Sequence, residues 1–390
     1  MQRVYLDSNS TTPLDPRVAE AVRPYLGPVF GNPSNLHSYG RECAEGLAEA
    51  REQVAQFLGA EPGEIHFTGS GTEADNWAVI GTARRHESRG RHLVVSPIEH
   101  GAVLESARYL AGRGFEVSWL PVDEHGLVDP EAVRRALRPD TVLVSVMLAN
   151  NEIGTVEPVA EIAAVCRERG VTCHTDAVAA AGKVEVDVRK LGVDLLTISG
   201  HKLHAPKGVG ALYIREGVEI EPLIHGGHQE RGLRAGTENV IGIVGMGRAC
   251  QLLAGEWREN AARMKANRDR LEQGIFARVP EVRLNGHPEK RLPNTAHFSV
   301  AYVEGEALLL SLDLEGIALA SGSACSAGEA GVSPTLAAIG VPPVFRNSPL
   351  RFSLGPETTA DEIDYALDRF ERVVARLRAI SPLWKNRPAG

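Results

Sequence analysis

Lysine is scarce in this sequence, with only seven among 390 residues and none before Lys183. Lys202 stands out because it follows an apolar run, residues 195–198, that predicts a buried strand. Open α/β sheets bind ligands just past the carboxyl ends of their strands, and burial there lowers a lysine pKa toward an amine that can form a Schiff base. The alternative is an ordinary lysine whose stem covers apolar surface at a strand end.

Cysteine is also scarce, and the five cysteines form no CxxC pair: Cys43, Cys166, Cys173, Cys250 and Cys325. An odd number without such pairs indicates reduced thiols and argues against a disulfide framework or a zinc knuckle. Cys325 differs from the others because it lies in SGSACSAG (residues 321–328), where small neighbours offer little to bury a thiol. We expect a reactive thiol there, and a small buried cysteine is the alternative.

Long apolar runs and an excess of positive charge are both absent. No run approaches the roughly 20 residues that cross a bilayer. The first ten residues lack the features of a signal peptide. The formal net charge of −8 argues against a surface that binds a nucleic acid. We therefore expect a cytoplasmic protein that does not bind a membrane, and does not bind a nucleic acid directly.

Strands and helices alternate between residues 64 and 215, which predicts a mostly parallel sheet covered on both faces. The expected strands are 64–68, 92–96, 116–121, 141–149, 171–175, 195–199 and 210–215. The pattern changes beyond Gly247, where a long amphipathic helix at about 256–278 leads into shorter strands and helices. The chain is also longer than one core usually serves. We expect an α/β domain over residues 16–256 and a smaller α+β domain from 1–15 with 257–390.

The segment TGSGTEADN (residues 68–76) joins a predicted strand to a helix through a glycine turn. The unpaired N–H groups and positive dipole end of such a helix favour an anion, although an ordinary turn capped by Thr72 has the same pattern. The motif is neither a Walker A loop nor GxGxxG, so nucleotide binding is not indicated. His100, Asn151 and Asp176 fall at or just past other strand ends, where ligands bind.

A lysine, a phosphate cradle, a strand-end aspartate and a flat histidine together suit pyridoxal phosphate. The lysine bonds to the cofactor aldehyde, and the helix N-terminus neutralises the phosphate. A carboxylate beside the pyridine nitrogen keeps that nitrogen protonated, so that the ring can accept electrons from the substrate Cα. An imidazole can cover the ring face.

The chain resembles the cysteine desulfurases of the NifS/IscS type, within the class V aminotransferase family of fold-type I pyridoxal phosphate enzymes. The resemblance covers essentially the whole chain. Its motifs here are YLDSNSTTPLDP, FGNPSNLHSYG, TGSGTEADN, EHGAVL, NNEIGT, HTDAVAAAGK, SGHKLHAPKGVG, GGHQERGLRAGTEN, SGSACS and LRFSLG. The resemblance implies a large domain with a mostly parallel sheet of the seven-stranded type and a smaller α+β domain with the cysteine loop.

The resemblance implies a role for each motif residue. Lys202 is implied to bond to the cofactor, Asp176 to contact the pyridine nitrogen and His100 to cover the ring. The implied phosphate contacts are Gly71, Thr72, Ser199 and His201, with Thr237 reaching the phosphate of the other subunit of a homodimer. Asn151 and Arg351 are implied to hold the substrate α-carboxylate, for which a planar guanidinium suits bidentate pairing. Asn151 is also implied to bind the cofactor.

The implied reaction is removal of sulfur from L-cysteine. Lys202 removes the Cα proton, the Cys325 thiolate attacks the substrate sulfur, and the products are L-alanine and a Cys325 persulfide. His100 is placed to move protons. A scaffold or carrier protein would then take the sulfur for iron–sulfur cluster assembly or for thiolation of tRNA or a cofactor. The glycine- and serine-rich cysteine loop is similar to that of the NifS/IscS branch.

Three residues depart from the family pattern. Ala179 stands where the family usually has a glutamine that donates a hydrogen bond to the cofactor's phenolic oxygen. Such a bond contributes roughly 0.5–1.5 kcal/mol, so the cofactor should still bind. Ser10 replaces a common alanine, and Ala205 replaces a common glycine, which would be strained if that backbone needs a positive φ.

Other functions remain open from the sequence. A selenocysteine lyase or an aminotransferase could use the same scaffold, and Ala179 makes a weakly active or silent cofactor-binding scaffold conceivable. Spacing also allows a metal at His201/His204 or His225/His228, but these histidines lie in the cofactor motifs, and we expect no metal.

Overall fold

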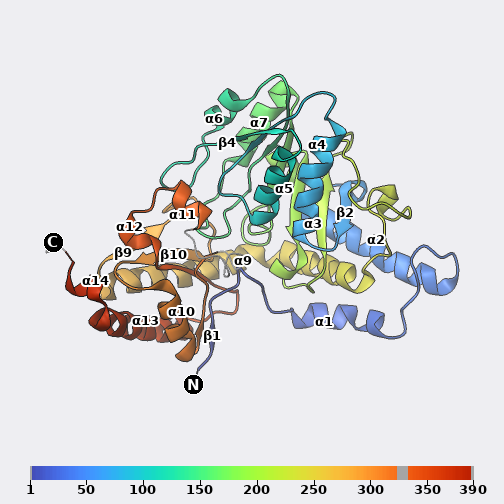
Figure 1. Ribbon diagram of the computed structural model, residues 1–390. Coiled ribbons are helices and arrows are strands. Elements are labelled where there is room, and N and C mark those ends of the chain that lie inside the picture. Colours follow the sequence, from blue (N-terminus) through green and yellow to red (C-terminus); the bar gives the residue numbers. More distant parts are fainter. Residues whose placement is uncertain (1, 323–332, 388–390) are drawn as a thin grey trace.

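The structure is a computed structural model that describes residues 2–322 and 333–387 (Figure 1). Its largest sheet has seven strands in the order β2-β8-β7-β6-β5-β3-β4. They are β2 (Ile65–Thr68), β3 (His92–Val95), β4 (Glu116–Trp119), β5 (Thr141–Ser145), β6 (Thr172–Asp176), β7 (Leu195–Ser199) and β8 (Gly210–Ile214). Only β8 runs antiparallel to its neighbours, β2 and β7. The predicted α/β class with a mostly parallel sheet is confirmed.

Helices cover both faces of this sheet, and the residues of every strand except β4 are nearly all buried. In β7, Leu196 and Ile198 join one core with α2 (Ser38–Leu58), α6 (Pro130–Ala136) and α7 (Val159–Arg169). Leu195 belongs to another cluster, with residues of α3 (Gly71–Asn76) and the helical turn Trp77–Gly81. The same helical stretch continues as α4 (Thr82–Arg85), and α5 (Gly101–Ala111) packs on the same side. Alternate strand residues therefore serve opposite faces.

Helix α9 (Val240–Arg278) is longer than predicted, since the expected helix began near residue 256. Its first part is apolar and rich in glycine, so it lacks the amphipathic pattern that marked the second part. Gly247 shows the reason: a Cβ there would lie 2.5 Å from the Ala50 Cα in α2. The glycines that allow α2 and α9 to pack closely therefore remove the amphipathic pattern from which a helix is predicted. Figure 1 shows α9 running beneath the large sheet and on into the C-terminal part.

A second core forms where the two ends of the chain meet. The antiparallel sheet β12-β10-β9 consists of β9 (Val282–Asn285), β10 (Thr295–Val300) and β12 (Pro349–Ser353). The N-terminal β1 (Val4–Tyr5) pairs in parallel with β11 (Ile317–Ala318). Val4 and Leu6 lie in the same core as residues of α9, α10 (Gly305–Leu314) and α13 (Ala360–Ile380). The sequence did not predict β9, whose first three residues are only half-buried.

Local capping signals agree with several predicted helix starts. Asp15 caps α1 (Pro16–Val22), Asp129 caps α6, and Thr359 forms a capping box with Glu362 at the start of α13. Helix α3 is capped by Ser70, whose Oγ accepts the Glu73 N–H, and not by Thr72. The remaining short helices are α8 (Val188–Leu191), α11 (Pro334–Ala338), α12 (Pro343–Arg346) and α14 (Pro382–Lys385).

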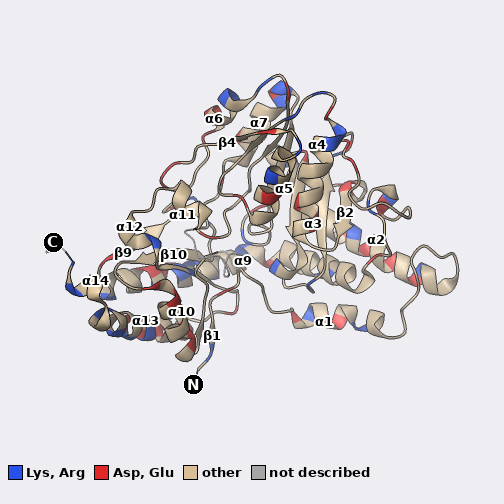
Figure 2. Ribbon diagram, in the orientation of Figure 1, with Lys and Arg blue, Asp and Glu red and all other residues tan. Residues whose placement is uncertain are grey.

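Basic and acidic residues alternate along the outer helices (Figure 2). Between α9 and α13, for example, Arg270 Nε donates to Asp364 Oδ1 at 2.7 Å. Such exposed pairs contribute little stability individually, but they interleave the two signs of charge. Within the described ranges, no helix has the length and apolar character that a membrane crossing requires.

We predict that Phe298→Ala destabilises the second core. Phe298 is fully buried in β10 and meets Phe352 edge-on, with ring centroids 6.4 Å apart. Truncation should lower the free energy of unfolding by about 3–5 kcal/mol, because it leaves a cavity in a packed core. Urea denaturation followed by circular dichroism measures this. Leu310→Ala, at a side chain 60% exposed, is the control, and an equal loss in both variants would contradict the prediction.

Candidate active site

A cavity of about 190 Å³ lies at the carboxyl edge of the large sheet. It brings together most of the predicted site residues, which arrive from separate strands and loops: Gly71, Thr72, His100, Asn151, Asp176, Ser199, His201, Lys202 and Arg351. Thr237 is not part of this lining. It is exposed before α9, and Cys325 lies outside the described residues. Asn9, Ser10, Ser70, Asp75, Met147, Val178 and Ala179 complete the wall.

Lys202 reaches the cavity from a single 3-10 turn, Gly200–Lys202, that directly follows β7. Its Nζ donates to the carbonyl oxygens of Asn9 and, at 2.8 Å, Ser10. The N-terminal segment therefore holds the amine at the sheet edge. The left-handed backbone predicted as a risk for Ala205 falls instead on His204, with φ of 62°. Ala205 is unstrained, so its replacement of glycine has no backbone penalty here.

Asp176 ends β6 and is buried, with Oδ1 accepting the Val178 N–H at 2.7 Å. Burial raises the pKa of this carboxyl, while His100, the Val178 N–H and Lys202 act in the opposite direction. Burial and the charge of Asp176 together hold the pKa of Asp75 well above its usual range. A buried carboxyl in this setting gains most from a cationic partner inside the cavity.

The turn between β2 and α3 forms another part of the cavity wall. Gly71 and Thr72 lie in the first turn of α3, where backbone N–H groups have no intrahelical acceptor. Gly210 of β8 allows this turn to approach, because a Cβ there would lie 2.5 Å from the Ser70 carbonyl carbon. Ser199 is adjacent at the end of β7. These groups form a preformed set of donors for an anion.

Two histidines flank the lysine. His201 Nδ1 lies 3.2 Å from Thr11 Oγ1, and burial, with Lys202 next in importance, lowers the His201 pKa to about 4. Its ring is therefore neutral at pH 7. His100 caps α5, and its Nδ1 accepts the Ala102 N–H at 3.1 Å. This hydrogen bond orients the His100 ring and assigns the proton of the neutral form to Nε2.

Arg351 reaches the cavity from β12 in the second core and is 1% exposed. Its guanidinium donates to Asp7 Oδ1 at 2.8 Å, to Ser10 Oγ at 2.6 Å and to the Asn151 carbonyl oxygen at 3.1 Å. Ser10, one of the three departures, therefore helps to orient this arginine. The predicted substrate partner is held rigidly by polar groups of the N-terminal segment.

The sequence did not predict that Asn9 and Asp75 line the cavity. Asn9 lies in a polar turn that looked like an ordinary connection, and its amide donates to Thr295 Oγ1 at 2.9 Å. Asp75 is hidden inside a helix, and its Oδ1 lies 3.6 Å from Nε2 of the buried His174. The only sequence signal for Asp75 in the cavity lining was that an acidic residue falls on the side of a helix that faces the sheet.

Ala179 lines the cavity without a polar side chain, and its carbonyl oxygen accepts a hydrogen bond from Lys183 Nζ at 3.0 Å. Burial lowers the pKa of Lys183 to about 7, with Lys202 adding to the shift.

Across the described part of the chain, no group of three or more histidine, cysteine or acidic residues is arranged to hold a metal. His204, for example, has its Nδ1 3.0 Å from the Pro13 carbonyl oxygen.

Comparison with known proteins shows the family to which this chain belongs. The aminotransferase class-V family matches residues 4–366, and the chain belongs to that family. Within it, the chain belongs with the cysteine desulfurases: it is 49% identical over 387 residues to "Cysteine desulfurase IscS" of Dictyoglomus turgidum, covering 98% of each sequence. A solved structure described as "NIFS-LIKE PROTEIN" matches with a TM-score of 0.91 and 39% identity, over 96% of this chain and all of the other. "SspA in complex with cysteine" matches with a TM-score of 0.81 and 33% identity, over 92% and all of the two chains.

The cofactor of this family is pyridoxal phosphate, and the cavity fits it. The first turn of α3, with Ser199 and His201, supplies donors suited to a phosphate. Asp176 supplies a buried carboxyl that favours a cationic ring nitrogen. Lys202 lies in the same cavity and supplies the amine. Anion donors, an acid and a lysine are thus combined in one small space.

We predict that Gly210→Ala weakens cofactor binding while the protein still folds. The added Cβ would meet the Ser70 carbonyl carbon and displace the first turn of α3. The dissociation constant for pyridoxal phosphate should rise about tenfold or more, as expected when a charge-assisted hydrogen bond is lost. Titration followed by absorbance measures this, with circular dichroism reporting the fold. Gly63→Ala is the control because nothing lies within 4 Å of its Cβ, and unchanged affinity in Gly210→Ala would refute the argument.

Proposed function

We propose that this protein is a pyridoxal phosphate-dependent cysteine desulfurase that converts L-cysteine to L-alanine and retains the sulfur on Cys325 as a persulfide. The observation that carries the proposal is the placement of Lys202 and Arg351 in one cavity with Asp176 and the first turn of α3. Arg351 adds a fixed cation for an amino-acid carboxylate beside a lysine and an acid that suit the cofactor. The relatives named above support the substrate.

When bound, pyridoxal phosphate withdraws electrons from the substrate Cα and so makes the Cα proton acidic. Gly71, Thr72, Ser199 and His201 would hold its phosphate, and Asp176 would keep the ring nitrogen protonated. Asn151 and Arg351 would orient the substrate carboxylate. Lys202 Nζ would remove the Cα proton. His100, with its neutral-form proton on Nε2, would move protons at the ring face.

The proposed sulfur transfer is a displacement at the substrate sulfur. The Cys325 thiolate forms a bond to that sulfur as the bond from sulfur to the substrate Cβ breaks, and the electron pair goes to the carbon fragment. That fragment takes up protons and leaves as alanine. Cys325 then carries the sulfur as a persulfide for an acceptor protein, in iron–sulfur cluster assembly or thiolation of tRNA or a cofactor.

The active unit is proposed to be a homodimer in which Thr237 contacts the cofactor phosphate of the other subunit. Thr237 is exposed and lies outside the lining of its own cavity. Its segment is anchored nearby, because Arg234 Nε donates to Glu73 Oε1 at 2.8 Å. An exposed threonine on an anchored segment suits a contact across an interface.

The domain limits and the cellular location are also proposals. The domain limits 16–256, and 1–15 with 257–390, are supported by two separate hydrophobic cores, one of which contains both Val4 and Phe370. A cytoplasmic location is supported only by the reduced-thiol pattern of the sequence.

We predict that Cys325→Ala eliminates sulfur release but leaves the cofactor in place. Wild-type protein given L-cysteine and a thiol reductant should form sulfide and alanine in equal amounts, whereas Cys325→Ala should form neither above about 1% of that rate, since its nucleophile is absent. Both should keep the visible absorbance of bound cofactor, and Lys202→Ala should lose it. Sulfide and alanine formed at the wild-type rate by Cys325→Ala would contradict the proposed role of this cysteine. Transamination without sulfide release in both proteins would favour an aminotransferase, and an inactive wild type with bound cofactor would favour the silent scaffold. Equal turnover of selenocysteine and cysteine would favour a selenocysteine lyase.

We predict that Thr237 acts across the dimer. Lys202→Ala and Thr237→Ala subunits, purified as tagged mixed dimers after co-expression, should contain one intact site per dimer, because that site takes Lys202 from the Thr237→Ala subunit and Thr237 from the Lys202→Ala subunit. The mixed dimer should therefore show about half of the wild-type activity per dimer. If Thr237 acts within its own subunit, neither site is intact and the activity stays at the level of the two single variants.

A further inference from the structure

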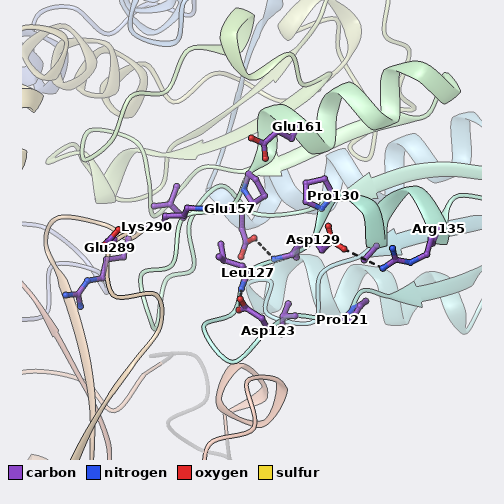
Figure 3. Close-up of a pocket in the computed structure, with 16 residues that line it drawn as sticks. Pro121, Asp123, Leu127, Asp129, Pro130, Arg135, Glu157, Glu161, Glu289 and Lys290 are labelled. Atoms are coloured by element: carbon purple, nitrogen blue, oxygen red, sulfur yellow. Dashed lines mark hydrogen bonds and ion pairs between the residues drawn. The ribbon is translucent and has the colours of Figure 1, made fainter.

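A second and larger cavity, of about 890 Å³, lies apart from the active-site cavity and shares no lining residue with it. Three segments form it: residues 121–135, which include the start of α6, residues 156–161 at the start of α7, and residues 289–291 between β9 and β10 (Figure 3). Cavities of this size accommodate small organic molecules.

Glu157 is the unusual residue of this cavity. Its side chain lines the cavity but the residue is only 4% exposed. Oε2 accepts the Val128 N–H at 2.9 Å, whereas Oε1 has no hydrogen-bond partner among the described residues. An unsatisfied buried polar atom is costly, and native structures contain few of them. A partner from outside the chain would satisfy this oxygen.

The walls of the cavity are apolar and fixed by backbone hydrogen bonds. Val122, Leu127, Val128 and Pro158 supply apolar surface. The Val156 N–H donates to the Lys290 carbonyl oxygen at 2.9 Å, and the Asp123 carboxylate accepts the Leu127 N–H at 2.8 Å. The site is thus largely preformed, which reduces the entropy lost on binding.

Acidic groups predominate around the opening, as Figure 3 shows for Asp123, Asp129, Glu161 and Glu289. Two of the three cations in the lining already have acidic partners. Arg135 lies 3.5 Å from Asp129, and Arg291 donates to Glu272 at 2.6 Å. Lys290 is then outnumbered by carboxylates. The charge of the cavity therefore favours a cation.

We propose that this cavity binds a compact organic cation, a guanidinium or ammonium group on a short apolar stem, with the Glu157 carboxylate as its partner. The stem would contact Val122, Leu127 and Pro158. The head group would donate to Glu157 Oε1, the oxygen for which the described residues provide no hydrogen-bond partner. This site does not depend on the proposed catalytic function.

The test compares two ligands of nearly equal shape by isothermal titration calorimetry on the cofactor-loaded protein. Butylguanidinium is the cation, and butylurea is its neutral counterpart. Neither contains a primary amine that could react with the cofactor aldehyde. Butylguanidinium should bind at least about tenfold more tightly, because a charge-assisted pair replaces a neutral one. Equal affinity, or no butylguanidinium binding at millimolar concentration, would overturn the proposal.

The affinity should also depend on pH in a defined direction. Burial, with a smaller contribution from Asp123, raises the pKa of Glu157 to about 8, so its carboxyl is mostly protonated at pH 7. A cation binds the ionised form, so the affinity for butylguanidinium should rise about tenfold per pH unit below pH 8 and level off above it. About 0.9 proton should be released on binding at pH 7. Other charged groups of the lining are Asp123, Asp129, Glu161, Glu289, Arg135, Lys290 and Arg291.

Matched variants locate the effect. Glu157→Gln keeps an acceptor for the Val128 N–H but removes the ionisable group, so it should abolish both the preference over butylurea and the proton release. Glu161→Gln makes the same change at an exposed rim position and should alter affinity less than about threefold, since exposed charge pairs are weak. Wild-type behaviour in Glu157→Gln would overturn the proposal.

The guanidinium group could belong to a free compound or to an arginine side chain of a partner protein. Arginine capped at both ends distinguishes the two sources. Binding of butylguanidinium alone supports a free small molecule, and equal or tighter binding of capped arginine supports a partner's side chain. Binding of neither ligand would contradict the site itself.

Discussion

The contact of the N-terminal segment with the sheet edge is the interaction on which the active site depends. Carbonyl oxygens of Asn9 and Ser10 accept hydrogen bonds from Lys202, and Asp7 and Ser10 hold the Arg351 guanidinium. β1 anchors the start of this segment in the second core, next to β11. The lysine from the large sheet and the arginine from the small one therefore share a common support.

Electrostatics within the cavity follow from burial more than from the number of charges. Asp75 and Asp176 are both buried, and each would be poorly solvated as an anion. Lys202, and in its charged form His100, favour the ionised form of Asp176, whereas Asp75 has no such cation and its pKa is raised further by Asp176. The cations therefore favour the charged form of Asp176, whereas burial and the charge of Asp176 both raise the pKa of Asp75. A site arranged this way favours a bound cationic ring over water.

Much of the fold was predictable because its signals are local. The alternation of apolar strands with helices located β7 at its observed limits. The first half of α9 was missed because glycines that allow close contact with α2 remove the amphipathic pattern. The Ser70 cap was missed because Thr72 is an equally good capping residue by type.

By itself, the sequence determined the order of strands and helices, the chemical types of the site residues and the family. Strand-end positions such as Lys202 and Asp176 are readable because parallel strands bring their carboxyl ends to one edge. Tertiary structure alone decided which distant groups come together: Ser10 beside Arg351, Asp75 near Asp176, and Glu157 in the wall of the second cavity. These contacts join residues far apart in the chain, and no local pattern encodes the burial that sets their protonation.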